Sequence, residues 1–331
     1  MNVMFVGPYR QNDSWGMVSR NFLEYIYNHA SEDINLITRP IYFNQQAVNK
    51  IHSYIEDSES KKLTNDRDIL IQFGLPSYLN YNGTFKKNVA VTRIECNVKN
   101  TDWPYHLNMF DEVVVFSDLE KNLLEESGVT TKILNAAAPY FGGITVAKDK
   151  IEKFENFGNK FVFFSTASAS ERSGTEAVVT AYLSQYSVLD KVMLVLFCDG
   201  REHENIIKMI RETRDKLNIF KNTDYYPPIA VSKNDGTEVL LEASDAYNCY
   251  INVSSASSIS IVDAIVMGSK KVPTIILDTI MSQQYPLSVK SVNKSCLLEQ
   301  RPVADLYSGE FEYQVPDMLS LKENMKRASG S

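Results

Sequence analysis

The chain has 331 residues, of which 44% are hydrophobic and 23% are charged, and its formal net charge is -7. This length predicts two domains, and the composition excludes a disordered chain. The acidic balance argues against a surface that binds nucleic acid along its whole length, although it leaves room for a local basic patch. No stretch approaches the ~18 apolar residues of a membrane span, so we expect no integral membrane segment.

The four cysteines, Cys96, Cys198, Cys249 and Cys296, are widely spaced and have no histidine at ligand spacing. We therefore expect no structural zinc, and free thiols that fit a reducing cytoplasm. The N-terminal MNVMFVGPYR lacks a charged segment followed by a long apolar one, so it does not indicate a signal peptide. These features predict a cytoplasmic protein.

The first half of the chain alternates short apolar runs with longer amphipathic segments, which is typical of parallel strands joined by crossover helices. The polar stretch 56–65 indicates a loop or a frayed helix end. We expect strands at 2–6, 35–38, 68–72, 88–93, 112–116 and 131–134, and helices at 17–29, 45–55 and 119–127.

A proline, paired glycines and the charged run 148–155 then interrupt the pattern, and we place a domain boundary there. The sequence thus predicts an α/β protein with two tandem Rossmann-like, doubly wound domains, at 1–145 and 146–331. Such sheets bind ligands beyond the carboxyl ends of their strands. In the second domain we expect strands at 161–165, 192–197, 250–253 and 272–277, and helices at 175–185, 203–217, 236–243 and 260–267.

Two strand ends of the first domain carry candidate acceptor-side residues. Gly7, Trp15 and Gly16 flank the start of the first helix, where exposed N–H groups favour anions, although an ordinary turn explains the glycines as well. The G-x-G-x-x-G fingerprint is absent. Glu95 follows the fourth strand, where a carboxylate serves as an acid, a base or a hydroxyl clamp. A salt bridge to Arg93 and an ordinary surface residue are the alternatives.

The stretch STASASERSGTE, residues 165–176, follows the first strand of the second domain. Arg172 offers bidentate contacts to phosphate oxygens. Ser168, Ser170 and Ser173 add hydroxyl donors just before a predicted helix start, whose N–H groups attract anions. Plain N-capping is the alternative explanation for such a loop.

The stretch NVSSASSISIVDAIVMG, residues 252–268, follows a later strand of the same domain. Ser255, Ser257 and Ser258 would form a second wall for a diphosphate, and Asp263 could accept hydrogen bonds from sugar hydroxyls. The four histidines are scattered, so we predict no metal site. The G-x-S-x-G and P-loop patterns are both absent.

Taken in order, these loops resemble those of the two-domain glycosyltransferases related to glycogen and sucrose synthases, family 4 of the B-type fold (GT-B). The segment TRIECNVKNTDWPYHLNMFDEVVVFSDLEKNLLEESGVTTKILNAAAPYF carries most of the resemblance. It matches the family at Glu95, Trp103, Asp111, Ser117 and Gly128. The chain departs from the family at Ser173, where relatives have lysine, and at Ser255, where they have a glutamate.

The resemblance implies a GT-B architecture with an interdomain cleft and a nucleotide-diphosphate sugar as co-substrate, with no cofactor and no metal. The diphosphate would lie on the loop 165–174 and the serines 254–258, with the ribose near Asp263. The acceptor would enter over the first domain, and the sugar would be transferred with retention. Glu95 and Arg172 would be the catalytic residues, and a C-terminal helix would pack back on the first domain.

Two alternatives stay open at the sequence level. The missing lysine and glutamate fit a catalytically silent protein that binds a sugar or a partner. The acceptor is a glycan, a small molecule or a modified DNA base as in viruses of bacteria; in the last case Lys86, Lys87 and Arg93 would form a local basic groove.

Overall fold

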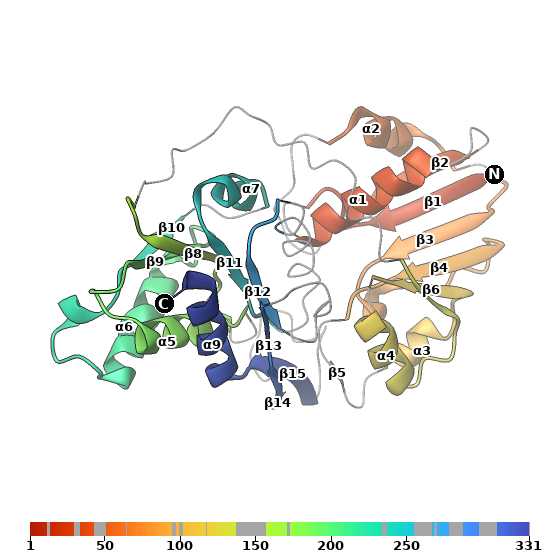
Figure 1. Cartoon of the computed structure of the whole chain (residues 1–331). Helices are drawn as coiled ribbons and strands as arrows, with labels where there is room; N and C mark the ends of the chain where they lie inside the picture. The colour runs from red at the N-terminus through yellow and green to blue at the C-terminus, as the bar shows by residue number, and fades with distance from the viewer. Residues whose placement is uncertain are drawn as a thin grey trace. The chain divides into compact units, whose positions relative to one another are not determined.

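The computed structural model divides into two compact units, each built on a parallel six-stranded sheet (Figure 1). One unit comprises Met1–Ile144 and Cys296–Phe311, and the other comprises Thr145–Ser295 and Glu312–Ser331. The predicted α/β class with two Rossmann-like domains is confirmed. The structure describes residues 1–11, 14–29, 34–42, 51–63, 65–94, 97–98, 102–116, 118–136, 157–170, 173–233, 237–254, 267, 270–277, 287–297 and 310–330.

In the first unit the strand order is β2-β1-β3-β4-β6-β7, and every pairing is parallel. An aromatic cluster joins the sheet to α1, because the Phe22 ring lies 6.1 Å from Phe5 and 6.0 Å from Phe116. The strands are β1 (Asn2–Gly7), β2 (Asn35–Pro40), β3 (Ile69–Phe73), β4 (Lys87–Val91), β5 (Asn97–Val98), β6 (Glu112–Val115) and β7 (Ile133–Asn135). The helices are α1 (Ser14–His29), α2 (Ser53–Ser60), η1 (Pro76–Tyr78), α3 (Trp103–Leu107) and α4 (Asp118–Glu126).

Helix α2 corrects the expected secondary structure of residues 51–60. We expected a helix at 45–55 followed by a loop or a frayed helix end at 56–65, and the helix that the structure describes begins at Ser53 and continues to Ser60. Buried Ile55 anchors it, and Glu59 in its last turn pairs with Arg10. Of the polar residues in the helical part of this stretch, Glu56, Asp57 and Ser60 are exposed, whereas Ser58 is buried. The earlier part of the expected helix, 45–50, lies outside the described residues.

In the second unit the strand order is β10-β9-β8-β11-β12-β13, again with every pairing parallel. The strands are β8 (Phe161–Thr166), β9 (Val192–Phe197), β10 (Ile229–Ser232), β11 (Cys249–Asn252), β12 (Thr274–Leu277) and β13 (Leu287–Val289). Two further strands, β14 (Ser291–Leu297) and β15 (Glu310–Pro316), have residues in both units. The helices are α5 (Thr175–Gln185), α6 (His203–Leu217), η4 (Thr223–Tyr225), α7 (Thr237–Ala246) and α9 (Met318–Ser329). The expected helix 260–267 lies outside the described residues, apart from Met267.

The core of the second unit lies along the central strands β8 and β9. Neighbouring Phe163 and Phe164 are both fully buried, as are Leu194 and Leu196 of β9. Consecutive buried residues mean that these strands are covered on both faces, which explains why they appear in the sequence as uninterrupted apolar runs. Helices α5 and α6 pack side by side on one face of this sheet (Figure 1).

Helix α9 packs against α5, β12 and β13 of the second unit (Figure 1). Its N-cap Asp317 accepts a hydrogen bond from the backbone N–H of Ser320 at 2.8 Å, and Leu321 and Met325 are fully buried. The resemblance led us to expect this helix on the first domain instead. The apolar side of α9 is used within the second unit, which is the physical reason for the difference. Among the described residues, no helix is both long and apolar enough to cross a membrane.

Candidate functional site

The second sheet has its topological switch point between β8 and β11. The chain runs outward from β8 through β9 to β10, and then returns across β8 to form β11 on its other side. The connection after β8 therefore leads to one side of this strand, and the connection to β11 leads to the other side. Such sheets bind ligands in the crevice beyond the carboxyl ends of the two strands at this point. The loop 167–174 follows β8, and residues 253 and 254 follow β11. We call these two segments the switch-point loops.

The switch-point loops lie in direct contact. Gly174 has a left-handed backbone with φ of 71°, and a Cβ atom there would lie 2.7 Å from the carbonyl oxygen of Val253. Only glycine combines this φ with this close approach at little cost. The glycine of the predicted diphosphate loop therefore fixes the position of that loop against the end of β11.

A chain of polar side chains also joins the two strand ends. The hydroxyls of Thr166 and Tyr250 lie 3.3 Å apart, and the Asn252 amide nitrogen donates to the Tyr250 hydroxyl at 3.2 Å. The Asn252 amide oxygen accepts hydrogen bonds from the backbone N–H and the hydroxyl of Ser254. Side chains from β8 and β11 thus position the residues at which both switch-point loops begin.

The hydroxyl of Ser173 is used inside its own loop. Its oxygen lies 2.7 Å from the carbonyl oxygens of Ser168 and Ser170 and 2.8 Å from the Thr175 hydroxyl, and it accepts from the Thr175 N–H at 3.2 Å. A hydroxyl has one proton, so it donates to only one of these oxygens at a time. Ser168 is similarly engaged, because its hydroxyl accepts from the Ser170 N–H. Among these serines, Ser170 is the exposed one.

A carboxylate lies on the same loop. The backbone N–H of Ala169 donates to Oε2 of Glu202 at 2.8 Å, and Glu202 directly precedes α6. A backbone N–H that donates to a carboxylate at the carboxyl edge of a parallel sheet is also suited to donate to a phosphate oxygen. Glu202 was not among the residues singled out from the sequence, because nothing in CDGREHE indicates that its side chain reaches back to the preceding crossover.

Six of the predicted site residues lie outside the described residues. They are Glu95, Arg172, Ser255, Ser257, Ser258 and Asp263. Their predicted roles therefore stay predictions. In the described part of the chain, no three His, Cys, Asp or Glu side chains come together as metal ligands would.

In the first unit, Gly7, Trp15 and Gly16 meet at the carboxyl end of β1. A Cβ atom on Gly16 would lie 2.0 Å from the carbonyl oxygen of Gln11, and one on Gly7 would lie 2.7 Å from the Phe5 ring. Gly16 is thus required for the close packing of α1 on the loop after β1, whereas the contact at Gly7 is with the end of a side chain. Arg20 of α1 fixes the same loop, donating to the carbonyl oxygens of Tyr9 and Gln11 at 2.8 Å.

Trp15 lies between Phe73 at the end of β3 and Arg93 beyond the end of β4. Its ring is 5.6 Å from Phe73, and the Arg93 guanidinium carbon lies 5.1 Å from its ring centroid. Arg93 is fully buried. The basic groove considered from the sequence is not formed. Lys86 pairs with Asp68, and Lys87 pairs with Glu112. Both lysines also lie at the opposite end of β4 from Arg93, about 20 Å away along the extended chain.

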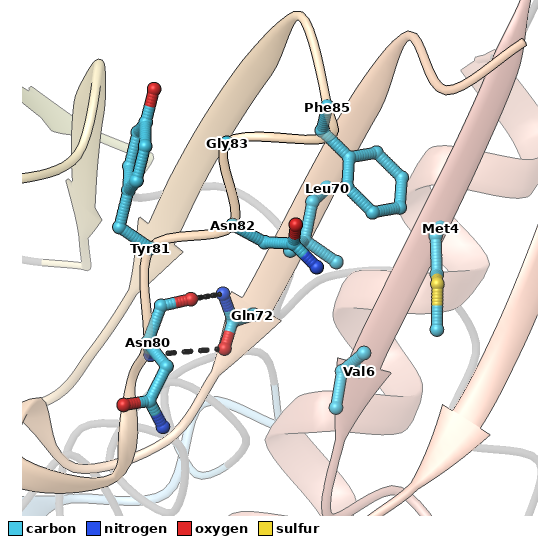
Figure 2. A pocket seen from close by; sticks show the side chains of 9 residues that line it. All are labelled: Met4, Val6, Leu70, Gln72, Asn80, Tyr81, Asn82, Gly83 and Phe85. Atoms are coloured by element: carbon cyan, nitrogen blue, oxygen red, sulfur yellow. Dashed lines mark hydrogen bonds between the residues drawn. The ribbon is translucent and has the colours of Figure 1, made fainter.

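A separate pocket of about 370 Å³ lies on the face of the first sheet, under the segment 80–85 (Figure 2). Gln72 holds this segment, donating to the carbonyl oxygen of Asn80 at 2.6 Å and accepting from its N–H at 3.2 Å. The pocket is lined by Met4, Val6, Leu70, Gln72, Asn80, Tyr81, Asn82, Gly83 and Phe85. None of the predicted site residues is among them, and the pocket lies over the middle of the strands rather than at their carboxyl ends.

The two Rossmann-like units have the GT-B fold of glycosyltransferases. The E. coli trehalose-6-phosphate protein bound with UDP-2-fluoro glucose is similar over 99% of this chain and 91% of its own, with 10% identity and a TM-score of 0.59. A UDP-forming α,α-trehalose-phosphate synthase from Burkholderia xenovorans matches over 99% and 90%, with 10% identity and a TM-score of 0.59. A Rickettsia africae glycosyltransferase matches over 84% and 79%, with 15% identity and a TM-score of 0.50. The chain matches no protein-family profile and no curated protein sequence.

Proposed function

We propose that the protein is a glycosyltransferase that moves a sugar from a nucleotide-diphosphate sugar to an acceptor with retention at the anomeric carbon. The observation that supports this most directly is the contact between Gly174 and Val253 at the switch point. It brings the loop before α5 against the end of β11, so that a helix N-terminus faces the crevice in which such sheets bind ligands. The GT-B fold agrees with this function, and family 4 is the relationship that the sequence motifs favour.

In this proposal Arg172 neutralises the leaving diphosphate together with the N–H groups at the start of α5. Ser170, Ser255, Ser257 and Ser258 add hydrogen bonds, and Asp263 binds the ribose. The bond between the anomeric carbon and the diphosphate oxygen breaks, the acceptor oxygen forms its bond on the same face of the sugar, and the acceptor's hydroxyl proton passes to the leaving diphosphate oxygen. Glu95 orients the acceptor hydroxyl. Preorganised donors of this kind contribute several kcal/mol to such a step without a metal or a cofactor.

A panel of UDP, GDP and ADP sugars tests the donor site by thermal shift, because a ligand bound only by the folded state raises the melting temperature. We expect one nucleotide family to raise the melting temperature of the parent chain, and Arg172→Ala to lose most of that rise. Arg211→Ala is the matched control, since Arg211 lies exposed on α6. If no nucleotide sugar shifts the parent chain, the proposed donor site is wrong.

A second candidate function is a catalytically silent sugar-binding protein. The engaged hydroxyl of Ser173 favours it, because this residue stands where the relatives have a lysine and its hydroxyl is shared among contacts inside the loop. Donor hydrolysis and transfer to a mixture of sugars, sugar phosphates and glycans distinguish the two. Turnover by the parent chain that is lost in Arg172→Ala excludes the silent protein. Donor binding without any turnover supports it.

We also propose that the protein works in the cytoplasm. Cys249 is a free and buried cysteine, and burial raises the pKa of its thiol. Buried thiols with this pKa are unreactive, which fits a protein that folds under reducing conditions.

A further inference from the structure

The connection between β3 and β4 leaves part of the first sheet uncovered. Residues 74–86 are all described, and the only helix among them is the three-residue η1. Parallel strands are usually joined through an α-helix that covers one face of the sheet. Met4 and Val6 of β1 lie on the face below this connection and are only half-buried, whereas Phe5, on the opposite face against α1, is fully buried. The short connection therefore leaves apolar surface open in the middle of the sheet.

The segment 80–85 stands over this surface as a fixed wall (Figure 2). Gln72 of β3 makes two hydrogen bonds with the backbone of Asn80, at 2.6 and 3.2 Å. The buried Asn88 of β4 treats Asn82 in the same way, since it accepts from the Asn82 N–H at 2.9 Å and donates to its carbonyl oxygen at 3.1 Å. Side chains of the sheet thus satisfy the backbone groups that a helix would pair internally. They hold the space under the wall open, and small-molecule sites are usually preformed in this way.

The space has the size and the lining of a small-molecule site. Its volume is about 370 Å³, which is more than twice that of an engineered cavity of about 150 Å³ that binds benzene. Met4, Val6 and Leu70 form an apolar floor, and the Phe85 ring lies beside it. None of the described residues that line the pocket carries a charge. Volume and lining therefore fit an uncharged molecule of about two fused rings.

Asn82 supplies the pocket with a hydrogen-bond donor. Its amide oxygen accepts from the N–H and lies 2.7 Å from the hydroxyl of Thr84, so the other amide atom is the nitrogen. This nitrogen donates to no group in the described part of the chain. In Figure 2 the Asn82 side chain extends from the wall toward Leu70. The Met4 thioether adds a preference for aromatic rings, because sulfur and ring edges attract each other.

We propose that this pocket binds an uncharged aromatic molecule of about two fused rings, and that an acceptor atom on its ring receives a hydrogen bond from Asn82. The site lies within the first unit, whereas the switch-point loops belong to the second. The proposal does not depend on the transferase function. It gives the protein a ligand site besides the one for the nucleotide sugar.

Three two-ring compounds test the pocket, each titrated into the full chain and followed by ligand-observed NMR. Quinoline is uncharged at neutral pH, and its ring nitrogen is an acceptor. Indole has a similar size, but its ring nitrogen only donates. N-methylquinolinium has the rings of quinoline with a positive charge and no acceptor. We expect quinoline to bind, indole to bind several-fold more weakly, and the cation not to bind measurably. Saturating UDP leaves quinoline bound, because the pocket is not the nucleotide site.

Asn82→Asp is the decisive variant. Aspartate keeps the oxygen that accepts from the Thr84 N–H, and it supports this kind of turn as asparagine does. It replaces the donor with a carboxylate, so we expect quinoline to bind roughly tenfold more weakly and the cation to bind better than quinoline. Asn222→Asp is the matched control, because Asn222 accepts from the Asp224 N–H in the same kind of turn in the second unit. It should leave the binding of both compounds unchanged.

Val6→Phe fills the pocket with a ring and should abolish the binding of all three compounds. Circular dichroism shows whether this variant folds, and if it does not, Asn82→Asp decides. Three results overturn the proposal: no binding of quinoline to the parent chain up to its solubility limit, displacement of quinoline by UDP, or quinoline affinities that are equal in Asn82→Asp and the parent. Failure of the nucleotide-sugar panel alone refutes the donor site and leaves this pocket standing.

Discussion

Gly174 lies against the backbone of Val253 with no room for a methyl group between them. Gly174→Ala therefore combines the cost of a left-handed backbone, about 1–2 kcal/mol, with a clash across the two switch-point loops. We expect a loss of more than about 2 kcal/mol in unfolding free energy, measured by urea denaturation, together with weaker nucleotide-sugar binding. Gly158→Ala separates the two costs, because Gly158 has a φ of 69° but a Cβ atom added there would meet no atom within 4 Å. Equal losses in the two variants would show that the contact with Val253 is unimportant.

Ser173→Ala tests whether this hydroxyl supports the loop. The substitution removes the acceptor for the Thr175 N–H and the donor to the carbonyl oxygens before it. A net loss of about 1 kcal/mol in unfolding free energy is expected for a hydrogen bond of this kind. Ser170→Ala, at an exposed position in the same loop, is expected to change stability by less than about 0.5 kcal/mol. If the order of the two effects is reversed, the hydroxyl of Ser173 does not support the loop.

Glu202→Gln tests the carboxylate that lies on the Ala169 amide. Glutamine keeps an oxygen to accept this N–H and removes the negative charge, so the loop keeps its anchor while repulsion of a diphosphate falls. We expect UDP to bind roughly two- to fivefold more tightly, the effect of one partly exposed charge, by isothermal titration calorimetry. Glu204→Gln, in the exposed first turn of α6, changes the net charge equally and should leave the affinity unchanged. An unchanged affinity in Glu202→Gln would place the diphosphate away from this amide.

The pair between Arg10 and Glu59 makes the first unit sensitive to acid. Hydrogen bonds from Arg10 at 2.7 and 2.6 Å lower the pKa of Glu59 below its ordinary value. A carboxyl with a lower pKa in the folded state stabilises the fold fully above its unfolded pKa of about 4.3. That stabilisation is lost as the pH falls through the folded pKa.

Glu59→Gln removes this part of the pH dependence. We expect it to cost about 1 kcal/mol of unfolding free energy at pH 7 and progressively less below pH ~4, measured by denaturant titrations across that range. Glu56→Gln on the exposed side of the same helix is the control. Parallel pH profiles for the parent chain and Glu59→Gln would mean that the pair does not contribute.

The central strands β8 and β9, which are buried on both faces, were predicted well. Residues 161–165 and 192–197 appear as continuous apolar runs because these strands lie in the middle of their sheet. The four-residue β10 was missed, since it lies at the edge of its sheet and all its residues are only half-buried. A short edge strand shows neither the continuous apolar run of a buried strand nor the regular alternation of apolar and polar residues of a half-exposed strand.

The location of the switch-point loops was predictable because it depends on strand order, which the alternation of elements indicates. The state of each side chain was not predictable. Whether the Ser173 hydroxyl points outward or back to the Ser168 carbonyl depends on backbone angles that glycine permits but the sequence does not specify. Arg93 was considered as a surface charge or as a partner of Glu95. Arg93 ends the run NVAVTR, whose apolar residues indicate a buried strand. Because arginine is rarely fully buried, the sequence did not predict that Arg93 is buried as well.

The packing of α9 on α5 has a consequence for synthesis of the chain. Helix α5 is made early in the second unit, and the helix that covers it is made after all the strands of that sheet. A nascent chain that has formed β8 and β9 therefore still exposes the α5 surface that α9 later covers. Such surfaces are prone to aggregation and are bound by chaperones on the ribosome. The second unit therefore completes its core only after residues 318–329 have left the ribosome.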